Sequence, residues 1–325
     1  MRRSSAVCAD RARFALAERI ADDLLYAGYI VHPYEAAAVR GGAVASVPPL
    51  VPRGSGAAGG PTWNLTDCLI EAPASAMLTL RLRFLHPQER TVEDADGRPL
   101  EALHVGRRRW TAWREAVPRA TTIGPLPLVS GLSRDVPFSW GAGRDVEEVR
   151  DGDGALCGRV VRTYQALDGR LTIDLRPADA FLRLRVFVEN RSACVGEGRC
   201  EPGEPVGGEV PANAFLAPHL LLAVQGGAFI PAGAVGAEGT PVSCRSHHTW
   251  PVLVGAPGTR HLLLSSPIPL PDYPCVGPRG SSLICTGAEP VAAPGMHAGR
   301  AVAEAPGLEE VTSVSGDTRA GRRAC

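Results

Sequence analysis

The stretch ALCGRVVRTYQALDGRLTIDLRPADAFLRLRVFVEN, residues 155–190, decides the fold. Apolar and polar side chains alternate in it on both sides of a short break at Pro177–Ala180. The apolar set consists of Leu171, Ile173, Leu175, Leu182, Leu184, Val186 and Val188. A period of two places one set of side chains on a buried face and the other in water. The stretch therefore predicts consecutive antiparallel strands of a half-solvated β-sheet.

Other parts of the chain repeat this pattern. Leu78, Leu80, Leu82 and Phe84 alternate with polar residues, and several short apolar runs bounded by Pro or Gly follow after residue 213. Residues 10–27 have apolar side chains near helical spacing, which predicts one helix. Together these elements predict a mainly β fold, an antiparallel β-sandwich-like domain with an N-terminal helix, with an α+β arrangement as the alternative.

Composition changes along the chain predict its domain organisation. Residues 1–40 are expected to form the N-terminal helix and a docking segment, and residues 41–61 a flexible Gly/Pro/Ala linker. Residues 62–278 form the predicted β-rich domain, within which the Pro-rich residues 121–140 are expected to be irregular. Residues 279–325 show neither a period of 2 nor of 3.6 and predict a disordered or frame-altered tail.

Charge and composition exclude several classes of function. The 34 basic and 34 acidic residues give a formal net charge of zero, so we expect no nucleic-acid partner and no anionic membrane surface. Every basic residue is Arg, which excludes Schiff-base lysine chemistry and a Walker-type phosphate loop. Arg183 and Arg185 are accordingly interpreted as the solvated side of a sheet and not as a basic binding stripe.

The sequence also predicts where the protein resides. No run approaches the ~20 apolar residues of a membrane span. Near the N-terminus Asp10, Arg11 and Arg13 interrupt any apolar region before it could serve as a signal peptide. We therefore expect a cytoplasmic protein without a membrane partner, in which most of the nine cysteines are reduced.

One group of residues could bind a metal. Cys244, His247 and His248 lie within five positions, and Cys194 and Cys200 could join them. Thiolates and imidazoles suit zinc or nickel, and a C-x-x-H pair can bind one ion from a turn. However, the C-x5-C spacing is not that of a standard zinc knuckle, and the alternative is a buried Cys244 with solvent-facing histidines. No other cofactor is expected.

Catalytic signatures are weak. Ser265 and Ser266 are available as nucleophiles, and His219 or His261 could act as a base, but no G-x-S-x-G elbow frames any serine. No glycine-rich segment has the strand–G-x-G-x-x-G–helix context of a dinucleotide site. The sequence therefore predicts no catalytic and no cofactor-binding residue.

Several long segments resemble one family of bacterial proteins. They are LLYAGYIVHPY (24–34), TDCLIEA (66–72), RLRFLHPQERTVEDADGRPLEAL (81–103), GRVVRTYQALDGRLTID (158–174), LRLRVFVENRS (182–192) and TWPVLVGAPGTRHLLLSSPIPLPDYP (249–274). In these segments the chain resembles an uncharacterised, mainly actinobacterial family associated with [NiFe]-hydrogenase gene clusters. Two regions depart from the family pattern, residues 41–61 and the residues after Pro278, and a reading-frame change in a GC-rich gene would explain the second.

This resemblance and the residues lead to three hypotheses. The resemblance implies a non-enzymatic accessory or assembly protein whose partners are hydrogenase subunits or maturation proteins. The second hypothesis is a β-sandwich ligand-binding module or a hydrolase of unknown substrate, with His104, Trp110 and Trp113, or the turn at Cys244–His248, lining a pocket. The third is a pseudogene-like product without activity.

Overall fold

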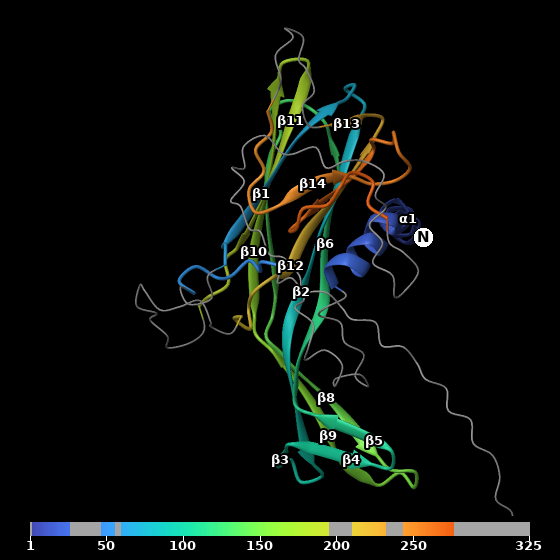
Figure 1. Ribbon diagram of the computed structural model, residues 1–325, viewed down its shortest axis with the longest axis vertical. Coiled ribbons are helices and arrows are strands. Elements are labelled where there is room, and N and C mark those ends of the chain that lie inside the picture. Colours follow the sequence, from blue (N-terminus) through green and yellow to red (C-terminus); the bar gives the residue numbers. More distant parts are fainter. Residues whose placement is uncertain (1, 27–46, 56–59, 195–209, 232–242, 276–325) are drawn as a thin grey trace, which may run out of the picture. The chain divides into compact units, whose positions relative to one another are not determined.

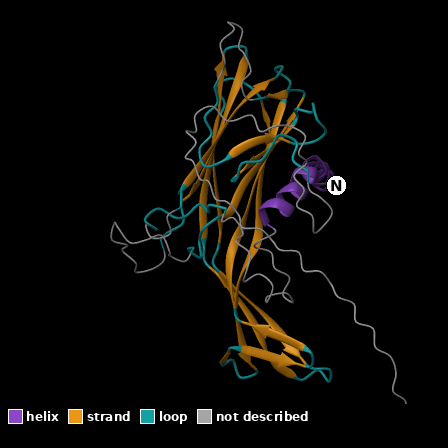
Figure 2. Cartoon of the chain, viewed as in Figure 1, coloured by secondary structure: helices purple, strands orange, loops and turns teal. Residues whose placement is uncertain are grey.

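The structure is a computed structural model of the chain, and it describes residues 2–26, 47–55, 60–194, 210–231 and 243–275. Figure 2 shows strands in most of this part and a single helical region near the N-terminus. The predicted tail 279–325 and the docking segment that follows the helix up to residue 40 lie outside the described residues. None of the helices in the described part of the chain is long and apolar enough to cross a membrane.

The described part of the chain forms one helical region followed by fifteen strands (Figure 1). In chain order the elements are α1 (Arg2–Ala21), the π-helical turn η1 (Asp22–Tyr26), β1 (Trp63–Glu71), β2 (Met77–Asp94), β3 (Pro99–Leu100), β4 (Ala102–Val105), β5 (Arg108–Thr111), β6 (Trp113–Pro127), β7 (Ser133–Trp140), β8 (Gly143–Arg150), β9 (Leu156–Tyr164), β10 (Leu167–Ala178), β11 (Phe181–Asn190), β12 (Leu216–Gln225), β13 (Ala228–Ile230), β14 (Trp250–Leu253) and β15 (Leu262–Ser266). The prediction of a mainly β fold with an N-terminal helix is confirmed.

Two antiparallel sheets carry the fold. The five-stranded sheet has the order β13-β1-β11-β10-β7, and the eight-stranded sheet has the order β14-β15-β12-β2-β9-β8, with β3 and β6 also paired to β2. β10 and β11 form the hairpin predicted from the opening stretch, with Leu171 opposite Val188 and Leu175 opposite Leu184. β9, which precedes them in that stretch, belongs to the other sheet. The stretch therefore crosses between the two layers.

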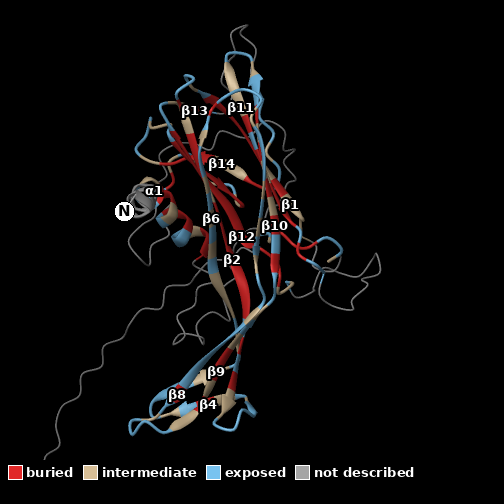
Figure 3. Cartoon of the chain, turned by 180° about the vertical axis from the view of Figure 1, so that it is seen from behind, coloured by how far each residue is buried: buried red, intermediate tan, exposed pale blue. Residues whose placement is uncertain are grey.

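The main hydrophobic core lies between the two sheets. Leu171, Ile173 and Leu175 of β10 are fully buried there, as the period of two predicts. Leu80 and Leu82 of β2 meet them from the eight-stranded sheet. Figure 3 shows buried residues along both sheets. Every second residue of these strands is thus removed from water, which is the main term that stabilises a β-sandwich.

The outer face of the eight-stranded sheet is covered as well. Phe14, Ile20 and Leu25 of the helical region pack with Leu221 and Leu264 in a second core. β12 is therefore buried on both of its faces, which explains why its sequence LAPHLLLAVQ is almost continuously apolar.

Ion pairs fix the helix on this face. Arg81 of β2 pairs with Glu18, and the Arg83 guanidinium lies 2.7 Å from the Asp22 carboxylate. Arg81 also lies over the Phe14 ring and Arg83 over the Tyr26 ring, at 5.2 and 5.1 Å from the ring centroids. Each of the two arginines thus contacts one carboxylate and one aromatic ring of the helical region.

A third, smaller core forms around the C-terminal part of β2. Val92, Leu103, Val149 and Val160 are buried in it, and Trp110 packs against them. β2 therefore contributes to the main core with its first half and to this small core with its second half. At the junction, His86 is fully buried, with Nε2 3.0 Å from the Gln165 carbonyl oxygen and the Arg119 Nε donating to Nδ1 at 3.4 Å.

Two expectations about irregular segments were wrong. Residues 121–140, expected to be irregular, form the second half of β6 and all of β7. The reason is that both are edge strands, where proline is tolerated because its nitrogen faces solvent. The predicted linker 41–61 is ordered where it is described, since Leu50 exchanges two backbone hydrogen bonds with Phe215 and Val51 is buried.

Candidate functional site

The predicted metal ligands lie on a segment that crosses the edge of β1. We call residues Ser243–Thr249 the strap. His247 and Leu65 exchange two backbone hydrogen bonds of 2.8 and 2.9 Å, which align the strap antiparallel to β1. The Ser246 hydroxyl accepts from the Asp67 N–H at 3.0 Å. The strap is therefore built onto β1 as an additional, short strand-like neighbour.

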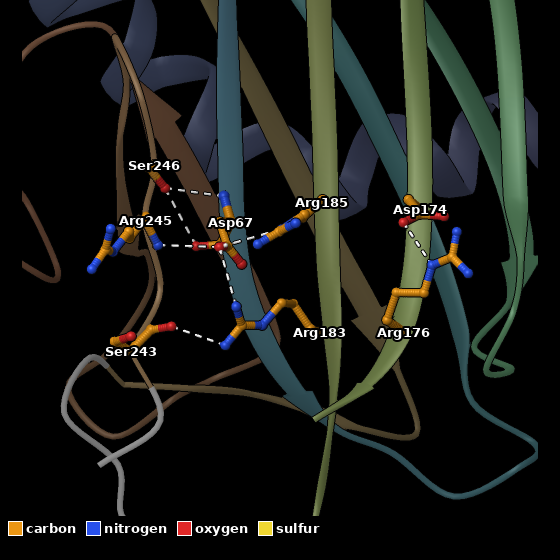
Figure 4. Close-up of polar contacts among 8 residues, drawn as sticks. All are labelled: Asp67, Asp174, Arg176, Arg183, Arg185, Ser243, Arg245 and Ser246. Atoms are coloured by element: carbon orange, nitrogen blue, oxygen red, sulfur yellow. Dashed lines mark hydrogen bonds and ion pairs between the residues drawn. The ribbon is translucent and has the colours of Figure 1, made fainter. Parts of the chain in front are cut away.

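Asp67 anchors the strap on the outer face of the five-stranded sheet (Figure 4). Its side chain is fully buried, and its Oδ2 accepts from the Arg245 N–H at 3.1 Å. The Arg183 Nη1 and Arg185 Nε lie 3.7 and 3.5 Å from the same oxygen. Arg183 also donates to the Ser243 carbonyl oxygen at 2.9 Å. It therefore contacts both Asp67 on β1 and the first residue of the strap.

The other oxygen of this carboxylate has an unusual environment. Oδ1 of Asp67 is buried and has no hydrogen-bond partner among the described residues. A buried acceptor without a donor costs about 1–3 kcal/mol. The two arginines and the strap therefore stabilise a carboxylate that remains partly unsatisfied.

An aromatic group lies beside the anchored carboxylate on the same face. The Trp63 ring stacks on Phe187, with 5.2 Å between centroids. His247 and His248 contact the other parts of the indole, with centroid distances of 5.8 and 5.5 Å. Trp63 and Phe187 are only partly buried and both histidines are exposed. The outer face thus presents four rings next to Arg185, whose side chain is about half exposed.

Several other charges on this face are paired with each other. Arg170 pairs with Asp135, and Arg176 with Asp174 at 2.9 Å. Glu189 accepts from Arg53 at 2.8 Å. Alternating positive and negative side chains across neighbouring strands are typical of a solvated sheet. Arg185 is about half exposed, whereas Arg183 is partly buried against the strap, so the interpretation of both as the solvated side of the sheet fits Arg185 only.

The predicted metal ligands are only partly brought together. His247 and His248 both reach Trp63, whereas Cys244 is exposed near Asp67, and Cys200 lies outside the described residues. Within the described ranges no group of three or more His, Cys, Asp or Glu side chains is arranged to hold a metal ion. The zinc or nickel site stays a prediction.

The two cysteines near Asp67 are poor nucleophiles. Burial raises the pKa of the Cys68 thiol well above its usual value, and the charges of Cys244 and Asp67 raise it further. The pKa of Cys244 is raised chiefly by desolvation and next by the Asp67 carboxylate. Since the thiolate is the reactive form, neither sulfur is activated at neutral pH.

The alternative to a metal site was a buried Cys244 with solvent-facing histidines. Cys244 is exposed, so that part is wrong, whereas His247 and His248 are exposed as the alternative predicts.

His104 and Trp110, which the second hypothesis places in one pocket, do not face a common cavity. In the β4–β5 hairpin Leu103 lies opposite Trp110 and His104 lies opposite Arg109. Successive residues of a strand point to opposite faces, so Trp110 enters the small core while His104 is exposed on the other side. A cavity of about 450 Å³ is lined by other residues, including Ile70, Leu128 and Phe181.

The proposed nucleophile Ser265 is part of a buried structural contact. Its hydroxyl lies 2.7 Å from the Thr66 hydroxyl of the other sheet and 2.7 Å from the Thr249 hydroxyl of the strap. His219 is buried elsewhere beside Tyr26, and His261 is exposed. No base therefore faces this serine among these candidates, and the three hydroxyls join the strap, β1 and β15.

This contact gives a testable prediction. Replacing Ser265 by alanine should lower the free energy of unfolding by about 1 kcal/mol, because the hydroxyls of Thr66 and Thr249 lose their shared partner inside the core. Urea denaturation measures the change. The double variant Thr66→Val with Ser265→Ala should lose little more than the single variant, and a fully additive loss would contradict a shared contact.

Sequence reasoning missed Asp67 and Trp63 as members of the site. The only local signal is that Trp63 and Asp67 are four positions apart, an even separation that places both on one face of a strand. No family model, no curated protein and no solved structure matches this chain. The function must therefore be argued from the geometry of this face and from the resemblance.

Proposed function

We propose that the chain is a non-enzymatic accessory or assembly protein that binds a partner protein through the outer face of the five-stranded sheet. The observation that carries the proposal is the group of Trp63, Phe187, His247 and His248 beside the half-exposed Arg185. Aromatic residues and arginine are enriched in the centres of protein interfaces and dominate their binding energy. Rings that are held by a backbone-bonded strap are also ordered before binding, which lowers the entropic cost.

The resemblance suggests the partner. The segments that resemble the hydrogenase-associated family include residues 66–71 of β1, most of the β10–β11 hairpin, and β14 and β15, which follow the strap in the chain. The partner of this face is accordingly a subunit or a maturation protein of a [NiFe]-hydrogenase. A role in binding accords with the internal pairing of several other charges on the face, because paired charges can form the polar rim of an interface.

Co-purification tests both parts of the proposal. Tagged chain is expressed together with a [NiFe]-hydrogenase gene cluster, and the retained polypeptides are identified by mass spectrometry. We expect a hydrogenase subunit or maturation protein to be retained. The variant Trp63→Ala should reduce the retained amount at least about tenfold, as expected for a tryptophan at the centre of an interface.

The matched control is Trp113→Ala, which removes a partly buried tryptophan from β6. Circular dichroism first confirms that both variants are folded. Retention that is equal for Trp63→Ala and the wild-type chain would exclude the face as the binding surface. Failure of the wild-type chain to retain any hydrogenase polypeptide would instead exclude the hydrogenase system.

A further inference from the structure

The edge strands of the two sheets differ in how they are protected. An exposed edge presents unpaired N–H and C=O groups that can pair with another chain, and proline or a short length prevents this. β6 carries Pro118, Pro125 and Pro127, β7 carries Pro137, and β14 carries Pro251. β13 is only three residues long. Four edges of the two sheets are thus blocked or short.

β8 is the exception. It spans eight residues from Gly143 to Arg150 and contains no proline. Among the described strands it is paired only with β9, so its second edge has no neighbour there. Arg144 to Glu148 are exposed in succession, and 45% of Val146 is accessible to solvent. An accessible valine in the middle of an open strand is a ready site for strand pairing.

The side chains of β8 are complementary to themselves. If two copies pair antiparallel with Val146 opposite Val146, then Arg144 of each copy lies opposite Glu148 of the other. These residues are separated by even numbers of positions, so all three share one face of the strand. The side chains of Arg144 and Glu148 are 54% and 49% exposed. Within one copy Arg144 lies 3.2 Å from Glu93 and Glu148 lies 2.7 Å from Arg150, so each would exchange or share its partner on pairing. The two-fold axis therefore produces one apolar pair flanked by two opposite-charge pairs.

The other face of the strand would place Asp145 opposite Glu147 of the second copy. Arg162 on β9 reduces this repulsion in part, because it lies opposite Asp145 in the ladder and its Nη1 is 2.9 Å from Glu147, although its Nε also pairs with Glu115 at 2.6 Å. The register of β8 shifts between Val149 and Arg150, and such an irregularity disrupts a ladder. The favourable pairing is thus confined to the part of β8 before the shift.

We propose that β8 is a homodimerisation strand, which pairs antiparallel with β8 of a second copy about Val146 and joins two eight-stranded sheets into one. A C2 arrangement of this kind uses the same surface on both copies. The occupant is a second copy and not an unrelated peptide, because the charges of this strand complement each other in the symmetric register. The inference is independent of the partner that binds the five-stranded sheet.

Charge exchange tests the register. The oligomeric state of the full chain is measured by sedimentation velocity over a concentration series. The wild-type chain should show a concentration-dependent dimer. Arg144→Glu and Glu148→Arg each place two pairs of like charges across the axis and should raise the dissociation constant at least about tenfold, since like charges directly opposite are destabilising.

The double variant Arg144→Glu with Glu148→Arg restores both opposite-charge pairs and should recover the dimer. Arg176→Glu on the five-stranded sheet is the control for a changed net charge and should leave the dimer intact. A wild-type chain that stays monomeric, or a double variant as weak as the single variants, would overturn the proposal. Hydrogen exchange on the wild-type chain checks it without mutation, because protection of the β8 amides should rise with protein concentration.

Discussion

Replacing Asp67 by alanine is expected to lower the free energy of unfolding by about 2 kcal/mol. The substitution removes the acceptor of the Arg245 N–H and the shared counter-ion of Arg183 and Arg185, and hydrogen bonds to charged groups are worth about 1.5–3 kcal/mol. The loss is smaller than for a wholly buried ion pair because both arginines can return to water. Urea denaturation followed by circular dichroism measures it.

Two further variants separate the contributions. Asp67→Asn keeps an acceptor for the Arg245 N–H but removes the charge, so its loss should lie between those of the wild-type chain and the alanine variant. Asp174→Ala is the matched control, because Asp174 pairs with Arg176 on the same face but is partly exposed. Its cost should stay below about 1 kcal/mol. Equal losses for Asp67→Ala and Asp174→Ala would show that Asp67 does not anchor the strap.

Acid should destabilise the protein before its carboxylates titrate. Burial lowers the pKa of His86 from 6.5 to about 4, and the Arg119 charge lowers it further. Burial and Arg83 lower the pKa of His219 from 6.5 to about 3. Both histidines are therefore neutral in the folded chain and protonate more readily after unfolding. Their contribution to stability is complete above pH 6.5 and is lost as the pH falls towards 4 and 3.

The size of this effect follows from proton linkage. Between pH 6.5 and pH 5 the two histidines together should remove about 3 kcal/mol of stability. Urea denaturation at half-unit steps of pH measures the slope. His219→Phe should reduce the slope by about half. A stability that stays constant over this interval would contradict neutral, buried imidazoles.

The sequence predicts the β10–β11 hairpin well because a half-buried sheet imposes its period of two on the chain. Leu171 and Val186 could be assigned to the core from local alternation alone. The segment 121–140 was misread because proline usually indicates irregular structure, and a sequence does not show which strands will become edges. The separation of β9 from β10 into different sheets is likewise a tertiary property, since both strands show similar alternation.

The candidate site was less predictable for a different reason. Cys244, His247 and His248 drew attention because of their side-chain chemistry, and the structure places them on the strap. What organises that segment is Asp67, which meets Arg245 across 178 positions of the chain. No local pattern in the sequence indicates which distant backbone will donate to Asp67. The aromatic group around Trp63 depends on the same long-range contact.

The position of β2 has a consequence during synthesis of the protein. Its first half packs against β12, and Leu85 pairs with Leu216, about 130 residues later in the chain. The first half of β2 therefore leaves the ribosome long before its strand neighbour β12 exists, and its backbone groups on that edge stay unpaired until β12 has emerged. During that interval the open edge of β2 is exposed to aggregation or to a molecular chaperone. Slowing translation between β2 and β12 should therefore lower the yield of native protein.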